Sequence, residues 1–485
     1  MIEQLKEKTI NGFFWSFFSQ FGRQILTLVI TIFLARLLSP TEFGLIALVT
    51  ALTGFASIFT ELGYGSALIQ KKDASDLDYS SVFWINIIIG VFLTLLFSIG
   101  SGLVVRFYDN PDLKTITILL SFNFLLNAIT IVQRIQLVKD IQFKLLAKIE
   151  LTAILMSGVL AIILAYNGFG VYSLVAQILT IAVVSNIILW YNSSWRPSFL
   201  IDKESIKSLN KFSINLMGNQ IFGYWTKNLD NLLIGKYLGA DALGIYSRSY
   251  SLLAYRVNSI SKVLSRVMFP TLSNIQDDNL RIRNIYLKVV KMICFIVFPL
   301  IVGLYFTAEN VIFLLFGEKW MAMVPVFKAL SIFGFALAIG SVHGNIYLAK
   351  GKTGLQLKVG VFFKSLSIVA IIIGLKWGVL GVAYSLGVVS LLSQFPQIMI
   401  TGNLIGLKLK EVIKALYKIF ICAFLIGGII WFIGALFFLS DVLLLITQIL
   451  VGILSYLGFV YLVEREFVVE VLGIIKRKKN LKSKK

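Results

Sequence analysis

The sequence predicts an all-α integral membrane protein with about fourteen transmembrane helices. We expect two parallel, pseudo-symmetric lobes of six helices around a central cavity, followed by two C-terminal helices. Composition, the spacing of apolar segments and an internal repeat support this fold class. Of the 485 residues, 58% are hydrophobic and only 14% are charged, and the mean hydropathy is +0.87. A soluble domain needs a more polar surface than this composition allows, so we expect a lipid bilayer around the chain.

The apolar segments are long enough to be membrane spans. A helix needs roughly 20 apolar residues to cross a hydrocarbon core of about 30 Å. The predicted spans are residues 10–37, 43–69, 79–106, 113–133, 145–166, 169–192, 212–237, 242–269, 288–308, 321–348, 354–375, 377–404, 415–436 and 441–463. They define an N-lobe (1–206), a C-lobe (207–407), a pair of C-terminal helices (408–464) and a basic tail (465–485).

Lys and Arg are distributed unevenly between the two sides of these spans. Most lie in the N-terminus, the even-numbered loops and the C-terminal tail. The odd-numbered loops contain only Arg36, Arg106, Lys114, Lys236, Lys319 and Lys376. Because cytoplasmic loops are the basic ones, both termini are predicted to be cytoplasmic. The net charge of +21 therefore has a membrane explanation, and we expect binding to membrane lipids and no binding to nucleic acid.

A short pattern recurs at an offset of 200 residues. The segment FLARLLSPTEFGLIA covers the end of the first predicted span and the turn into the second, and LLIGKYLGADALGIY covers the same stretch between the seventh and eighth spans. Arg36 aligns with Lys236, and Gly44 aligns with Gly244. Because six spans separate the copies, both keep the same orientation in the membrane. The two lobes should then be related by an axis along the membrane normal.

Polar side chains line one face of the first span, and Arg23 lies near its middle. Gln20, Arg23 and Thr27 follow one another at steps of three and four residues, which places them on one helix face. An ionisable group in the hydrocarbon region costs at least about 2.5 kcal/mol, so it normally faces water or a partner. We expect this face to line the cavity.

A matching polar face is predicted on the seventh span. It contains Asn215, Asn219 and Asp230, with Lys227 at its border, and the repeat offset aligns Thr27 with Lys227. Lys227 and Arg23 together would suit a diphosphate or a uronate. An equally good interpretation is that Lys227 simply neutralises Asp230, three residues further along the helix.

Other charged residues within spans complete the candidate site. Arg248 and Arg256 lie in the eighth span, whose polar residues are spread almost all round, and Glu61 ends a polar face on the second span. The sequence contains no glycine-rich phosphate loop and no nucleophile elbow, so no enzyme activity is predicted. Cys294, Cys422 and the single His343 are interpreted as packing residues, and no metal site or cofactor is expected.

Two segments resemble a known family. Residues 61–86 (ELGYGSALIQKKDASDLDYSSVFWIN) and 229–252 (LDNLLIGKYLGADALGIYSRSYSL) are similar to Wzx-type polysaccharide flippases of the O-antigen, teichuronic and colanic acid type. These belong to the multidrug, oligosaccharidyl-lipid and polysaccharide exporter superfamily. The resemblance implies a twelve-helix, two-lobed core with two additional helices.

The resemblance also implies a function. Such a protein would move an undecaprenyl-diphosphate-linked oligosaccharide from the cytoplasmic to the outer leaflet of a bacterial inner membrane by ion-coupled alternating access. The cationic cavity residues would by position be Arg23, Lys227, Arg248 and Arg256, and Asp230 and Glu61 would be the candidates for ion coupling. A polysaccharide polymerase or glycosyltransferases are implied as partners, and we expect a monomer. The alternative function is a multidrug or cation antiporter on the same fold, although its substrates would favour acidic cavity residues.

Overall fold

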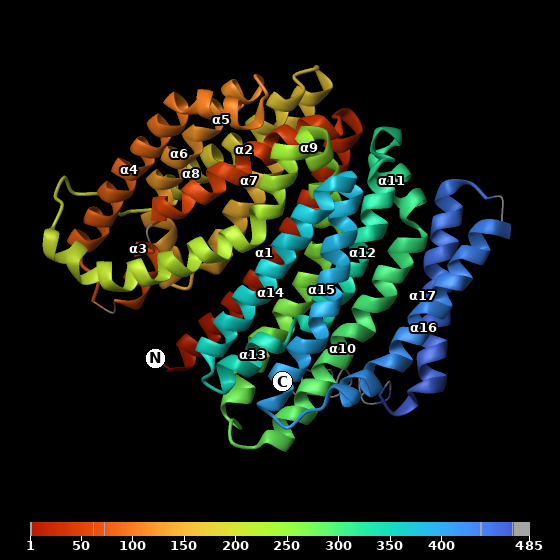
Figure 1. Ribbon diagram of the computed structural model, residues 1–485. Coiled ribbons are helices and arrows are strands. Elements are labelled where there is room, and N and C mark those ends of the chain that lie inside the picture. Colours follow the sequence, from red (N-terminus) through yellow and green to blue (C-terminus); the bar gives the residue numbers. More distant parts are fainter. Residues whose placement is uncertain (1, 62, 72, 437–438, 468, 470–485) are drawn as a thin grey trace. The chain divides into compact units, whose positions relative to one another are not determined.

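The computed structural model describes residues 2–61, 63–71, 73–436, 439–467 and 469 of the chain (Figure 1). Every regular element within these residues is a helix, as the sequence predicts. The α-helices are α1 (Ile2–Leu37), α2 (Pro40–Glu61), α3 (Tyr64–Gln70), α4 (Asp76–Ile99), α5 (Ser101–Tyr108), α6 (Leu113–Lys139), α7 (Phe143–Tyr166), α8 (Val171–Asn192), α9 (Lys203–Ser273), α10 (Asn279–Phe306), α11 (Ala308–Phe316), α12 (Met323–Gly340), α13 (His343–Ala349), α14 (Thr353–Gly374), α15 (Gly378–Asn403), α16 (Leu409–Leu436) and α17 (Asp441–Val463). Two short 3-10 helices lie at Glu318–Trp320 and Leu375–Trp377.

The predicted spans correspond closely to these helices. Within the described residues, 11 segments are long and apolar enough to cross a membrane. One of them, Thr353–Asn403, is 51 residues long and covers two predicted spans. Helix α9 covers two more predicted spans but is not among these segments. The all-α membrane class is confirmed, and the number of fourteen stays a prediction.

Helix α4 begins with a capping box. This helix starts within residues 61–86, the first of the two segments that resemble the flippase family. The Ser75 hydroxyl accepts a hydrogen bond from the Asp78 amide at 3.2 Å, and the Asp78 carboxylate accepts one from the Ser75 amide at 2.9 Å. Lys71 donates to the same carboxylate at 2.8 Å. Two amide donors at the helix start, which lack partners within the helix, are satisfied in this way.

Helix α9 runs for 71 residues because two helices meet at Gly239 with almost no loop between them. Gly239 has a φ of +83°, a backbone conformation that glycine adopts without steric cost. The second copy of the repeat lies at this bend. The seventh and eighth predicted spans are therefore the two arms of one bent element.

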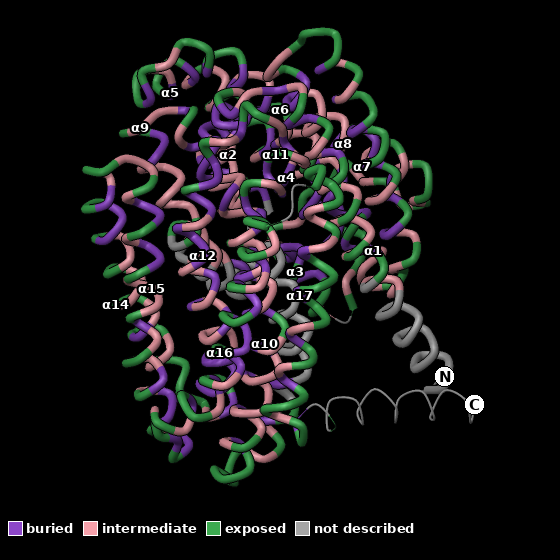
Figure 2. Tube along the Cα trace, turned by 90° about the vertical axis from the view of Figure 1, so that its right-hand side faces the viewer, coloured by how far each residue is buried: buried purple, intermediate pink, exposed green. Residues whose placement is uncertain are grey.

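Residues 1–244 and 245–485 form two compact units, and the boundary falls inside α9. In the first unit, α4, α6 and α3 enclose a core that includes Leu68, Val82, Phe83 and Val132. Exposed apolar side chains line the outer faces of helices, and Figure 2 shows this as exposed stretches alternating with buried ones along α7 and α8. That pattern suits helices whose outer face meets lipid. The predicted division at residue 206 follows the repeat and stays a prediction.

The two copies of the repeat meet each other inside the first unit. A Cβ atom on Gly44 would lie 1.7 Å from the carbonyl oxygen of Ala240, and one on Gly244 would lie 1.9 Å from that of Pro40. The Thr41 hydroxyl also donates to the Asp241 carboxylate at 3.1 Å, across 200 positions of sequence. Gly44 thus meets the counterpart of Pro40, Gly244 meets Pro40 itself, and Thr41 meets its own counterpart, which is the reciprocal pattern of a local two-fold axis.

The second unit contains an interrupted helix at the predicted span 321–348. Helix α12 ends at Gly340 and α13 begins at His343. His343 is 5% exposed, and its ring stacks on that of Tyr286 in α10, with 6.1 Å between the centroids. Cys294 and Cys422 are buried free thiols. The packing interpretation of all three sequence positions therefore agrees with their burial.

A cluster of charges joins the end of α17 to α10 and α16 within the second unit. Glu464 follows α17 and forms ion pairs with Lys291 of α10 at 2.7 Å and Lys418 of α16 at 3.2 Å. Nearby, the Tyr456 hydroxyl donates to the Phe295 carbonyl at 2.8 Å. Burial on its own would raise the pKa of Glu464, but hydrogen bonds and ion pairs with both lysines outweigh it and hold that pKa below its usual value.

Replacing Glu464 with glutamine should loosen the end of α17. Because the folded-state pKa is lowered, the ion pairs stabilise the attachment above the unfolded pKa of about 4.3, and this contribution is lost as pH falls through the folded pKa. At neutral pH we expect Glu464→Gln to lower the opening free energy of α17 amides by about 1 kcal/mol. Hydrogen exchange of these amides should become faster as a result. Glu466→Gln, an exposed neighbour, is the control. Equal exchange in the two variants would contradict the role of the cluster.

Candidate functional site

Arg23 projects from α1 and is half-buried. Its Nη2 atom donates to the Gln20 side-chain oxygen at 3.2 Å, so the two predicted cavity residues do share a helix face. Thr27, one turn further, is exposed. Within the described residues, Arg23 makes no ion pair, and its described partner is a neutral amide. Its positive charge is thus left to an anion or to water.

An ion pair that the sequence did not reveal lies beside this face. Ser19, one turn before Arg23 on α1, donates to a carboxylate oxygen of Glu150 on α7 at 3.1 Å. The other carboxylate oxygen forms an ion pair with Arg134 of α6 at 2.9 Å. The side chain of Arg134 is 61% exposed and that of Glu150 is 26% exposed. Glu150 therefore joins three helices and pairs with a second cation, Arg134.

Arg134 and Glu150 were missed because both fall near predicted span boundaries. Arg134 is the first residue after the span predicted at 113–133, and it therefore falls in a predicted cytoplasmic loop. Helix α6 continues to Lys139 and so carries Arg134 within it. Glu150 lies in the second turn of α7. An acid facing a polar stripe across two helices has no signature in a single sequence.

Lys227 and Asp230 lie in the first arm of α9. The side chain of Lys227 is exposed, and although both residues are described, the structure records no ion pair between them. Asp230 is half-buried and accepts a hydrogen bond from the Asn231 amide at 2.8 Å. The structure therefore does not contain the ion pair by which Asp230 would neutralise Lys227. Lys227 remains a candidate for anion binding.

Aromatic residues next to Lys227 pack against α2. The Tyr224 hydroxyl donates to the Ala51 carbonyl at 2.8 Å, and a Cβ atom on Gly54 would lie 2.6 Å from that hydroxyl oxygen. Phe55 lies 5.0 Å from Trp225 between ring centroids. Tyr224 is thus a packing residue that joins α2 to α9, rather than a free platform for sugar stacking.

The polar face of α2 satisfies its own donors. The hydroxyls of Thr50, Thr53 and Ser57 donate to backbone carbonyls three or four residues earlier, at 2.7, 3.1 and 2.7 Å. Such bonds leave only acceptor lone pairs for a ligand or water. This face can accept hydrogen bonds, but the cationic groups must come from other helices.

Of the other predicted site residues, Arg248 is described by the structure, and the side chains of the remaining four are not. Arg248 is half-buried and belongs to the second unit. The side chains of Asn215, Asn219, Arg256 and Glu61 lie outside the described part of the structure. No group of three or more His, Cys, Asp or Glu within the described residues has a geometry that would hold a metal ion. Among the predicted site residues that the structure describes, Arg23 and Gln20 are in contact, and a guanidinium beside an amide suits anions and hydroxyls.

Comparison with known proteins gives consistent results. A family described as polysaccharide biosynthesis protein matches residues 33–325, more than half of the chain. Teichuronic acid biosynthesis protein TuaB of Bacillus subtilis (strain 168) is 30% identical over 354 residues, covering 72% of this chain and 73% of that protein. Lipopolysaccharide biosynthesis protein WzxC of Escherichia coli (strain K12) is 27% identical over 372 residues, covering 76% of each chain.

Solved structures with the same fold are membrane transporters. Lipid II flippase MurJ in an inward closed conformation has a TM-score of 0.76 at 18% identity, covering 95% of this chain and 100% of that chain. An inward-facing multidrug resistance MATE family transporter of the MOP superfamily has a TM-score of 0.62 at 15% identity, covering 79% of this chain and 94% of that one. At such low identity the likeness shows the fold alone, and it confirms the predicted class of multi-pass membrane protein.

Proposed function

Because this chain belongs to the polysaccharide biosynthesis protein family, we propose that it flips an undecaprenyl-diphosphate-linked oligosaccharide from the cytoplasmic to the outer leaflet of a bacterial inner membrane. The relatives named for teichuronic acid and lipopolysaccharide biosynthesis support a glycan cargo. The likeness to a structure named as a lipid II flippase supports a fold that suits lipid-linked cargo.

One observation carries the proposal for the site. Arg23 is a half-buried guanidinium in a membrane-embedded helix, and its described partner is the neutral amide of Gln20. A cation there is costly unless an anion or water compensates it. The diphosphate of a lipid-linked sugar supplies oxygens that a guanidinium binds with charge-assisted, bidentate hydrogen bonds. Lys227, Arg248 and Arg256 are proposed to extend this cationic path.

Several finer features belong to the same proposal. Both termini are cytoplasmic, and the protein acts as a monomeric transporter rather than as an enzyme. Translocation is coupled to an ion, for which Asp230 and Glu61 are the candidate carboxylates. A polysaccharide polymerase and glycosyltransferases are the expected partners. The basic even-numbered loops support the orientation of the termini.

The leaflet distribution of the lipid-linked oligosaccharide tests the function. In cells that lack the protein, we expect this oligosaccharide to accumulate in the cytoplasmic leaflet, where an added impermeant sugar-binding probe cannot reach it. Wild-type protein should restore access to the probe. An unchanged pool, together with Asp230-dependent drug resistance, would instead support the multidrug antiporter alternative.

A further inference from the structure

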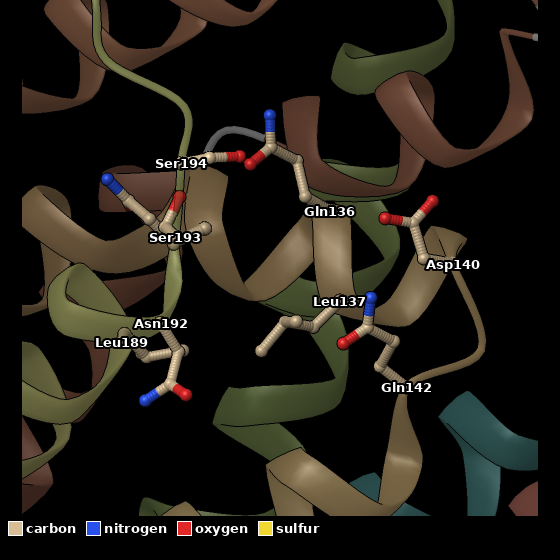
Figure 3. A pocket seen from close by; sticks show the side chains of 9 residues that line it. Gln136, Leu137, Asp140, Gln142, Leu189, Asn192, Ser193 and Ser194 are labelled. Atoms are coloured by element: carbon tan, nitrogen blue, oxygen red, sulfur yellow. The ribbon is translucent and has the colours of Figure 1, made fainter.

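A polar cavity of about 100 Å³ lies in the first unit, between α6, the turn into α7 and the end of α8. Its walls carry the amides of Gln133, Gln136, Gln142 and Asn192 together with hydroxyls and two leucines. Figure 3 shows the labelled side chains around the cavity, with those of Gln136 and Ser194 beside each other. No residue assigned to the cationic site lines it.

The innermost amide of the cavity has no partner. Gln133 is 1% exposed, and neither its side-chain nitrogen nor its oxygen makes a hydrogen bond within the described residues. The rim residues Asp140, Gln142 and Asn192 are exposed, and Gln133 is the most buried residue of the lining. A buried amide without a partner is costly, and it usually indicates a bound molecule or ordered water.

The walls of the cavity are held in place. On α8, Asn186 and Trp190 donate to the carbonyls of Leu126 and Ile129 on α6 at 2.9 and 3.2 Å. The segment that follows Ser194 is tied to α4, because the indole of Trp84 donates to the Ser198 carbonyl at 2.8 Å. The polar groups are therefore positioned before any ligand arrives, which lowers the entropic cost of binding.

The chemistry of the lining selects for uncharged hydroxyl groups. An amide both donates and accepts hydrogen bonds, as does a hydroxyl, and the leucines offer a surface for C–H groups. None of the nine lining residues is cationic, and Asp140 at the rim repels anions. The nearby Lys139 points elsewhere and donates to the Lys71 carbonyl at 2.9 Å. The nine lining residues therefore offer no cationic side chain to a phosphate or a uronate group.

We propose that this cavity is a recognition site for the neutral sugar hydroxyls of the cargo, separate from the cationic site. The inference rests on the proposed function, since a lipid-linked glycan supplies such hydroxyls. A cavity of about 100 Å³ has room for several water molecules, so it admits one edge of a sugar ring. In the absence of sugar, water occupies the cavity, and the incoming hydroxyls take over its hydrogen bonds.

Sugar binding by the full-length protein in lipid nanodiscs tests the proposal. Glucose, galactose and mannose are titrated in parallel at millimolar concentrations, and the melting temperature is the readout. We expect a saturable rise with at least one hexose and a much smaller rise with glucuronate. Gln133→Met should raise the dissociation constant for the hexose at least tenfold. Gln394→Met, which removes a half-buried amide from α15, should leave it unchanged.

The variants separate recognition from folding. Gln133→Met removes an unpartnered amide, so without sugar it should melt at or above the wild-type temperature. If it does not fold, Asn192→Ala at the exposed rim carries the test, with the same loss of binding expected. No saturable shift with any hexose, or equal binding by the variants, would overturn the site. If leaflet transfer is normal but no sugar binds, this inference alone is overturned. If sugar binds but the lipid-linked pool is unchanged in cells that lack the protein, the proposed function alone is overturned.

Discussion

Replacing Gly44 with alanine is expected to destabilise the protein strongly, although the change adds only one methyl group. The added Cβ would lie 1.7 Å from the backbone oxygen of Ala240, and no flexible side chain can move aside to make room. The start of α2 and the bend of α9 would have to separate. We expect a loss of about 3 kcal/mol, at the upper end for overpacked sites. Thermal unfolding of the purified protein measures it.

A matched glycine provides the control. Gly360 lies within α14, and a Cβ atom there would meet nothing within 4 Å, so Gly360→Ala should be neutral or slightly stabilising. Gly244→Ala should resemble Gly44→Ala, because its Cβ would lie 1.9 Å from the Pro40 oxygen. The double variant should lose less than the sum of the two, since one separation relieves both clashes. Equal melting of Gly44→Ala and Gly360→Ala would show that the close contact is absent.

Replacing Arg23 with alanine is expected to reduce translocation by about ten- to a hundredfold without removing the protein from the membrane. A hydrogen bond to a charged group contributes roughly 1.5–3 kcal/mol, which corresponds to that range. Arg23 makes no ion pair among the described residues, so its removal leaves no carboxylate unpaired. The measurement is the rate at which lipid-linked oligosaccharide becomes accessible to an external probe.

Two further variants define what Arg23 does. Arg23→Lys keeps the charge but loses the planar fork of donors, and it should retain part of the rate. Arg106→Ala removes an exposed arginine at the end of α5 and should leave the rate unchanged. A normal rate in Arg23→Ala would remove Arg23 from the cargo path. A similar loss of rate in Arg106→Ala would show that the effect of Arg23→Ala comes from the change in net charge and not from the position of Arg23.

The sequence predicts the helices well because the bilayer imposes a simple rule. A chain in lipid must satisfy its backbone within helices of fixed minimum length, so apolar runs predict spans directly. Helix α17 starts and ends where the prediction places it, at Asp441 and Val463. The match between Gly44 and Gly244 could also be read from the sequence, because neither position has room for a side chain.

The side-chain arrangement is less predictable, because it depends on residues that are distant in sequence. Glu150 gains its role from Ser19, which is 131 positions away. The cavity at Gln133 exists only because the end of α8 lies beside α6, and neither segment has a distinctive pattern. Tyr224 has the residue type and place of a sugar-stacking group, yet it packs on α2. Helical periodicity predicts which face a residue occupies, but it cannot identify the partner on that face.

The meeting of the two repeat copies bears on how such a chain can arise and change. A contact in which Gly44 faces Ala240 and Gly244 faces Pro40 is the kind that two identical half-length chains form as a symmetric dimer. In a dimer, one mutation alters both sides at once. In a single chain each side mutates alone, and the residues aligned by the repeat already differ, with Pro40 matching Ala240 and Thr41 matching Asp241. A single chain thus allows the two sides of this contact to change independently, while the paired glycines remain alike.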